Sequence, residues 1–378
     1  MLTKEKFEIL LQTQNTPSIS IYLPTYRMGN AQEDRIRLKN ALSDAKDLLV
    51  ESGKSEKESL KFLKKGFDLL EKADFFSHLS DGLAVFITEE AFYRLIVPID
   101  FDPLVYLGQS FYLRQLIPLL NQQPPFYLLT LSQGNVKLFE IEQFAITPIK
   151  IKDVIPENID EALALEETSD NIQAHSGNPN NTPVYHGQGA GKDQKNFELA
   201  HYFRIIDEGL TKILPDGDPL MIAAVDYLVP IFKDVAKYSN ILEAHLSGNL
   251  ENIAPGFLHE KALAALPDYF NSQRNKAIEN FQAYAAENRA TAYINDIIPA
   301  AIAGKVETLF TCKNILSWGA YDASSHKVSI HPEKQKDSVC LLNLAAVNTF
   351  QQGGQVFNLD RTAMPITTAN VNAIYRYE

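Results

Sequence analysis

Short apolar runs of strand length alternate with longer stretches of helical period along most of this 378-residue chain. The clearest runs are SISIYLP at 18–24, GLAVFIT at 82–88, FYLLTL at 126–131 and PLMIAAV at 219–225. Between them, apolar residues recur at steps of three and four, as expected for helices with one buried face. Alternation of this kind is typical of sheets covered by helices, so the sequence predicts an α/β protein.

The length favours two or three domains, at roughly 100–200 residues per domain. The segment NQQPP at 121–125 carries paired prolines and is the first linker signal. We predict an N-terminal α/β domain with a helical hairpin at 1–123, a middle domain at 124–255 and a C-terminal α/β domain at 256–378.

The predicted helical hairpin has two apolar faces separated by the turn SGKSEKE. The first helix is expected to bury Leu38, Leu42, Ala45 and Leu49. The second is expected to bury Leu60, Leu63, Phe67 and Leu70. The first helix also carries Arg35, Arg37, Lys39 and Lys46. These cations form either a solvated helix face or an RNA contact.

The charge balance restricts the possible partners. Lys and Arg total 35 against 47 Asp and Glu, a net charge of −12, which argues against broad coating of nucleic acid. We expect no DNA partner. The amphipathic N-terminus lacks the pattern of a secretory leader, and no apolar run approaches the roughly 18–20 residues of a membrane span. The sequence therefore predicts a cytoplasmic protein with no membrane partner.

A polar, glycine-rich segment at 166–195 interrupts the pattern, and its low apolar content predicts a mobile excursion. It contains VYHGQGAGKD at 184–193, directly before a strong helical pattern. The spacing of Gly187 and Gly191 is one residue too short for a phosphate-binding loop, and Asp193 replaces its hydroxyl residue. Two interpretations remain: a solvated flexible loop, or a loop whose Gln188 orients a water for attack on an ester.

The chain resembles the bacterial release-factor-like families of the archaeo-eukaryotic class 1 peptide-chain release factor superfamily. The resemblance is carried by SISIYLP with the helical hairpin and DGLAVFIT, by FYLLTLSQGNVKLFEI with the HGQGAGKDQK loop, and by GKVETLFT and NAIYRY. It implies an RNase H-like middle domain and a ribosomal-protein-like α/β sandwich at the C-terminus. It also implies the ribosome and tRNA as partners, with no cofactor.

In that family a Gly-Gly-Gln loop of the middle domain promotes hydrolysis of peptidyl-tRNA. Carried over to this chain, Gly187 and Gln188 match its second and third residues, and His186 stands at the first. Gly189 would add mobility to the loop. Lys192 and Lys195 would contact RNA phosphates. The alternative is a non-catalytic ribosome- or RNA-binding adaptor that retains the fold.

Three further patterns bear on the kind of activity, on the location of the catalytic loop and on a possible metal site. The family's codon-reading motifs, Asn-Ile-Lys-Ser and Tyr-x-Cys-x-x-x-Phe, do not occur, which favours rescue over codon-specific termination. A literal Gly353-Gly354-Gln355 is interpreted as a helix cap followed by a strand, since glycine past a helix end is the usual cap. His175, His186 and His201 are spaced too irregularly for helical metal ligands, so no metal site is expected.

Overall fold

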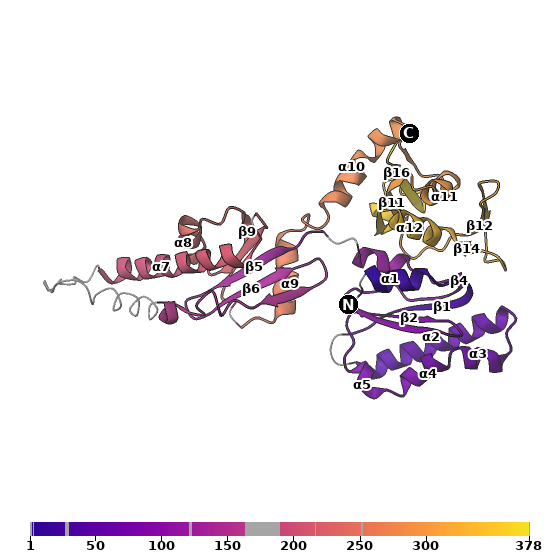
Figure 1. Ribbon diagram of the computed structural model, residues 1–378, viewed down its shortest axis with the longest axis horizontal. Helices are drawn as coiled ribbons and strands as arrows, with labels where there is room; N and C mark the ends of the chain where they lie inside the picture. The colour runs from indigo at the N-terminus through magenta and orange to yellow at the C-terminus, as the bar shows by residue number, and fades with distance from the viewer. Residues whose placement is uncertain are drawn as a thin grey trace. The chain divides into compact units, whose positions relative to one another are not determined.

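The computed structural model describes residues 2, 4–26, 30–120, 123–162, 190–215, 217–250 and 252–377, with the side chains of Lys4, Ala73 and residues 190–196 excepted. The chain divides into two compact units. The terminal unit combines Met1–Gln122 with Ser272–Glu378, and the middle unit is Gln123–Asn271. Both contain sheets covered by helices, which confirms the predicted mixed α/β class (Figure 1).

The N-terminal part of the terminal unit has an antiparallel sheet of order β3-β2-β1-β4. Its strands are β1 (Gln14–Pro24), β2 (Gly82–Ile87), β3 (Phe92–Val97) and β4 (Leu104–Ser110). The helices of this part are α1 (Lys4–Leu11), α2 (Ala31–Glu51), α3 (Glu56–Phe62), α4 (Lys64–Leu70) and α5 (Ala73–Phe76), followed by the 3-10 helix η1 (Arg114–Leu119). β2 and β3 pair as an antiparallel hairpin, with Ile87 opposite Phe92.

The long helix α2 covers one face of this sheet and buries Leu38, Leu42, Ala45 and Leu49, as predicted. The prediction for Leu60 is wrong, because this side chain is 45% exposed. The second helix is not continuous: it breaks at Leu63, which ends α3 and precedes α4. One helical stripe continues across this break, and Leu60 lies outside it. The buried residues of the stripe are Ser59, Phe62, Leu63, Gly66, Leu69 and Leu70.

The C-terminal part of the terminal unit has one sheet of order β10-β16-β11-β15 and a smaller one of order β13-β12-β14. The strands are β10 (Ala290–Thr291), β11 (Val306–Cys312), β12 (Trp318–Asp322), β13 (Lys327–His331), β14 (Val339–Cys340), β15 (Gln355–Leu359) and β16 (Val371–Tyr375). The helices are α10 (Ser272–Ala286), α11 (Ile294–Ile302), α12 (Leu341–Gln351) and the 3-10 helix η3 (Arg361–Ala363).

Buried hydrogen bonds join the N-terminal and C-terminal parts of this unit. The Asn343 Oδ1 atom accepts from the backbone N–H groups of Leu113 at 2.8 Å and Arg114 at 3.0 Å. The Arg114 guanidinium donates to the carbonyl oxygens of Cys312 at 3.0 Å and Ile315 at 3.1 Å. Buried polar groups are costly unless paired, so these bonds hold η1 to the C-terminal sheet.

The middle unit has a five-stranded sheet of order β7-β6-β5-β8-β9, with β5 parallel to β8 and antiparallel to β6. Its elements are β5 (Phe126–Leu131), β6 (Val136–Ile141), β7 (Ile146–Ile149), α7 (Ala190–Ile213), β8 (Leu220–Ala224), α8 (Leu228–Val235), β9 (Ile241–Ser247) and α9 (Pro255–Ala265). Counted along this unit, the strand order is 3-2-1-4-5.

Helices cover both faces of the middle sheet, so β5 and β8 are buried along their whole length. Leu129 and Ile222 face α7 and α8, whereas Leu128 and Met221 face α9. Successive strand residues point to opposite faces, which explains why these strands read as continuous apolar runs. α9, which the sequence-based domain limits place in the C-terminal domain, packs with the middle sheet.

Candidate functional site

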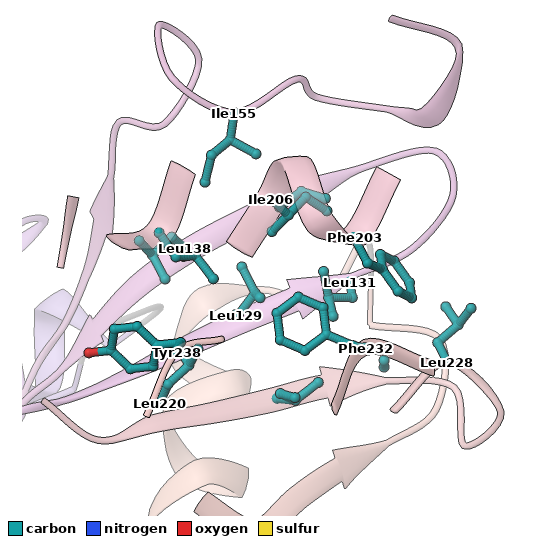
Figure 2. Packing of buried hydrophobic residues seen from close by; sticks show 14 of the residues in the cluster. Leu129, Leu131, Leu138, Ile155, Phe203, Ile206, Leu220, Leu228, Phe232 and Tyr238 are labelled. Atoms are coloured by element: carbon teal, nitrogen blue, oxygen red, sulfur yellow. The ribbon is translucent and has the colours of Figure 1, made fainter. Parts of the chain in front are cut away.

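α7 is the element that follows the glycine-rich loop, and it is firmly anchored. Its side chains Leu199, Tyr202, Phe203, Ile206 and Leu210 are buried against the sheet. Figure 2 shows Phe203 and Ile206 above Leu129 and Leu131 of β5, with Phe232 of α8 beside them. Burial of large apolar side chains contributes about 1.5–3 kcal/mol each, so α7 is a stable support.

Two polar contacts fix the far end of α7. The buried Asp207 carboxylate accepts from the backbone N–H groups of Lys237 at 2.8 Å and Tyr238 at 3.1 Å, which ties α7 to the segment after α8. Gly209 lets the neighbouring segment approach, since a Cβ there would lie 2.3 Å from the Ile155 Cγ1 atom. These contacts set the position of the helix relative to the sheet.

The predicted catalytic residues His186, Gly187, Gln188 and Gly189 lie outside the described residues. α7 begins at Ala190, the next residue in the chain. Of the segment 166–195 that is predicted to be mobile, residues 166–189 also lie outside the described residues. Residues 190–195 belong to α7 and are helical. The loop is thus followed directly by the first turn of a long anchored helix.

Lys192 and Lys195 lie in the first turns of α7. Their spacing of three residues places them next to each other on the helix surface. The start of a helix also carries a partial positive charge, because its first N–H groups have no partner within the helix.

The tripeptide Gly353-Gly354-Gln355 caps a helix, as the sequence predicts. Gly353 has φ +74°, and the N–H groups of Gly353 and Gly354 donate to the carbonyls of Phe350 and Thr349 at the end of α12. A Cβ on Gly354 would lie 2.6 Å from the Thr349 Cγ2 atom. Gln355 begins β15, and its side-chain amide donates to the Gln273 side chain. This turn is held rigidly on both sides.

The basic residues of α2 are largely engaged in contacts with carboxylates. Arg35 lies 3.5 Å from Glu71, and Lys46 lies 3.0 Å from Glu56. Arg37 donates to Glu33 at 2.5 Å and to the Pro24 carbonyl at 3.1 Å. These pairs reduce the positive charge that α2 presents, which favours a solvated helix face over an RNA contact.

The described residues contain no group of three or more His, Cys, Asp or Glu side chains placed to hold a metal ion. His201 lies half-buried in α7, whereas His175 and His186 are outside the described residues. Cys312 and Cys340 are buried free thiols. Among the same residues, no helix combines the length and apolar character needed to cross a bilayer.

Residues 126–268, which make up nearly all of the middle unit, match the family model described as bacterial archaeo-eukaryotic release factor family 7. This match confirms the resemblance of the middle unit to a release-factor family, which its motifs suggested. It covers β5, β6, α7 and the loop before α7. No curated protein matches the chain significantly.

Several solved structures are similar at low identity. An archaeal translation termination factor, aRF1, is 13% identical with a TM-score of 0.23, and the alignment covers 100% of this chain and 99% of that one. Pelota from Archaeoglobus fulgidus is 11% identical with a TM-score of 0.30, covering 78% and 80%. Dom34 from S. cerevisiae is 11% identical with a TM-score of 0.35, covering 78% and 79%. The likeness to a release-factor family therefore holds for the middle unit and rests on the family-model match.

The bonds between η1 and the C-terminal part involve residues that sequence patterns did not single out. Arg114 and Asn343 are 3% and 7% exposed, but each lies within a largely apolar run, Arg114 beside Gln115 and Asn343 by itself. The role of a buried polar residue can be assigned only when its hydrogen-bond partners, here distant in sequence, are known. No local signal in the sequence could have paired them.

Proposed function

We propose that this protein promotes hydrolysis of ribosome-bound peptidyl-tRNA in a rescue process that needs no codon reading. The observation that supports the proposal is the position of the His186–Gly189 loop in the matched middle unit, directly before the anchored helix α7. A loop on a rigid support can enter a cavity supplied by another macromolecule while its base stays in place.

In this proposal the Gln188 side-chain amide orients a water molecule against the ester carbonyl carbon. The water oxygen forms the new bond to that carbon, the ester C–O bond breaks, and the tRNA 3′ oxygen leaves with a proton. Backbone N–H groups of the loop would stabilise the oxyanion that develops on the carbonyl oxygen. A carboxamide is too weak a base to remove the proton, so Gln188 acts by positioning.

Lys192 and Lys195 supply phosphate contacts beside the loop in this scheme. Their removal by substitution to glutamine is expected to weaken co-sedimentation with ribosomes, most clearly at low salt. Each lost contact lowers the slope of log affinity against log salt by about 1. Lys212→Gln, at the other end of α7, is the matched control and should leave binding unchanged. If the Lys192/Lys195 double variant binds ribosomes normally, with an unchanged slope of log affinity against log salt, these two lysines do not contact phosphates.

A non-catalytic adaptor is the second candidate, and one sequence observation favours it. His186 occupies the position of the first glycine of the family loop, and a Cβ restricts the backbone there. An adaptor would co-sediment with ribosomes but leave peptidyl-tRNA intact. The proposed enzyme would bind and also release the peptide.

A further inference from the structure

A groove of about 790 Å³ runs between α2 and β4 in the N-terminal part of the terminal unit. Its apolar lining includes Leu48 of α2 and Leu104 and Val105 of β4, all partly exposed. One wall carries the carboxylates of Asp44, Asp47 and Glu51, which are exposed. Their spacing of three and four residues places them along one face of α2.

Among the described residues, β4 pairs with β1 alone and is therefore an edge strand of its sheet. The Leu107 carbonyl accepts a hydrogen bond from the Lys334 Nζ atom at 2.8 Å, so this carbonyl points away from β1. Backbone groups of a strand alternate in direction with a period of two. The N–H and C=O of Val105 therefore point to the same open edge, where they can pair with another extended chain.

The contact of Lys334 shows that a basic side chain can bind at the open edge of β4. Its ammonium lies on a strand carbonyl and 5.4 Å from the centre of the Trp318 ring. Glu51 acts electrostatically on the same ammonium and opposes the lowering of its pKa by burial. The ammonium of Lys334 thus already occupies the open edge of β4 at Leu107, two residues beyond Val105.

The carboxylates of the groove wall remain available for further cations. Among the described residues, neither Asp44 nor Glu51 forms an ion pair. Asp47 lies 3.9 Å from Lys46, whose closer partner is Glu56 at 3.0 Å. Arg37 also lines the groove, but its guanidinium is paired with Glu33. The three carboxylates therefore favour cationic ligands over phosphates at this wall.

We propose that this groove binds an extended, lysine- or arginine-rich segment of a partner protein, which adds as a strand to the edge of β4. Main-chain hydrogen bonds to Val105 would give affinity, and alternate basic side chains would reach the carboxylates of α2. The apolar side chains between them would point to the opposite face of the sheet, on the side of Leu104. This surface is separate from the loop before α7, and its occupation requires no peptidyl-tRNA.

The test uses the full-length protein and a fluorescein-labelled eight-residue peptide of alternating lysine and valine, followed by fluorescence anisotropy. The wild type should bind this peptide and not a matched peptide of alternating glutamate and valine. The triple variant Asp44→Asn/Asp47→Asn/Glu51→Gln should bind about tenfold more weakly, since each exposed ion pair contributes a few-fold. Affinity should also fall as salt rises.

The matched control is Asp68→Asn/Glu90→Gln/Glu279→Gln, which removes the same charge from three exposed carboxylates that do not line the groove. It should bind the lysine peptide within twofold of the wild type. Thermal unfolding of both triple variants checks that they fold. Hydrogen exchange of the wild type should show slower exchange of the Val105 amide when the peptide is bound.

Five results would overturn the proposal. Four of them are no binding by the wild type, equal weakening by the two triple variants, binding without added protection of Val105, and direct binding of a labelled single-stranded RNA oligonucleotide that the groove variant abolishes. Self-association of the wild type that the groove variant abolishes would also overturn it, because a second copy would then be the occupant. None of these readouts depends on hydrolysis, so they leave the proposed activity untouched.

Discussion

Substitution of Asn343 by alanine tests the join between the N-terminal and C-terminal parts of the terminal unit. The Asn343 Oδ1 atom is the shared acceptor for the N–H groups of Leu113 and Arg114, and the residue is 7% exposed. Alanine keeps α12 helical but removes that acceptor. Two buried donors would then lack a partner at the start of η1.

The expected loss follows from the number of unsatisfied groups. A buried donor without a partner costs about 1–3 kcal/mol, so two of them predict a loss of about 2–4 kcal/mol after partial relaxation. Asn348→Ala is the matched control on the same helix, because the Asn348 amide donates only to the Leu344 carbonyl within α12. We expect that control to change stability by less than about 0.5 kcal/mol. Both substitutions replace asparagine by alanine within α12, so the free-energy gain from helix propensity is the same and cancels in the comparison.

Tryptophan fluorescence provides the assay, because Trp318 is the single tryptophan of the chain. It lies in β12, stacked on Tyr106 of β4 with ring centroids 5.6 Å apart. Urea unfolding followed at Trp318 therefore reports on this join. Similar midpoints and slopes for Asn343→Ala and Asn348→Ala would refute the reasoning.

Two further substitutions test local features of the terminal unit by the same urea titration. Gly354→Ala should lower stability by about 1–3 kcal/mol, because its Cβ would lie 2.6 Å from Thr349 and 2.7 Å from the Val306 carbonyl oxygen; unchanged stability would contradict the close approach. Burial raises the pKa of the Asp34 carboxyl, although the Tyr26 N–H and Arg37 lower it. An acid whose pKa is higher in the folded state contributes stability below its unfolded pKa of about 3.9 and loses it as pH rises through the folded pKa. Asp34→Asn should therefore become more stable relative to the wild type between pH 3.5 and pH 7, and a difference that falls over this range would contradict the sign.

Local patterns predicted much of the fold. The period of Leu38, Leu42, Ala45 and Leu49 placed α2 against its sheet, and the cap at Gly353 separated α12 from β15. Both features depend on residues close together in the sequence. The turn chemistry of glycine and the spacing of apolar residues therefore suffice to predict them.

Features that depend on distant partners were missed. Leu60 fits the apolar spacing of its neighbours, yet it lies outside the stripe of α3 and α4 that is buried. The apolar pattern did not predict β12 and β13, because β13 is largely exposed and has few apolar residues. Arg114 and Asn343 bond to segments about 200 or more residues away in sequence, beyond any local period. The role of Gln188 also stays a prediction, since its residue lies outside the described part of the chain.

The rate of peptidyl-tRNA hydrolysis on ribosomes tests the central claim most directly. Single-turnover release of a labelled peptide should be measured for the wild type, Gln188→Ala and Gln355→Ala, with co-sedimentation of each variant measured in parallel. We predict that Gln188→Ala slows release strongly while binding is kept, because the amide acts mainly on the transition state. Gln355→Ala should behave as the wild type. Equal release by Gln188→Ala and the wild type, or loss of release with Gln355→Ala alone, would contradict the assignment of the loop.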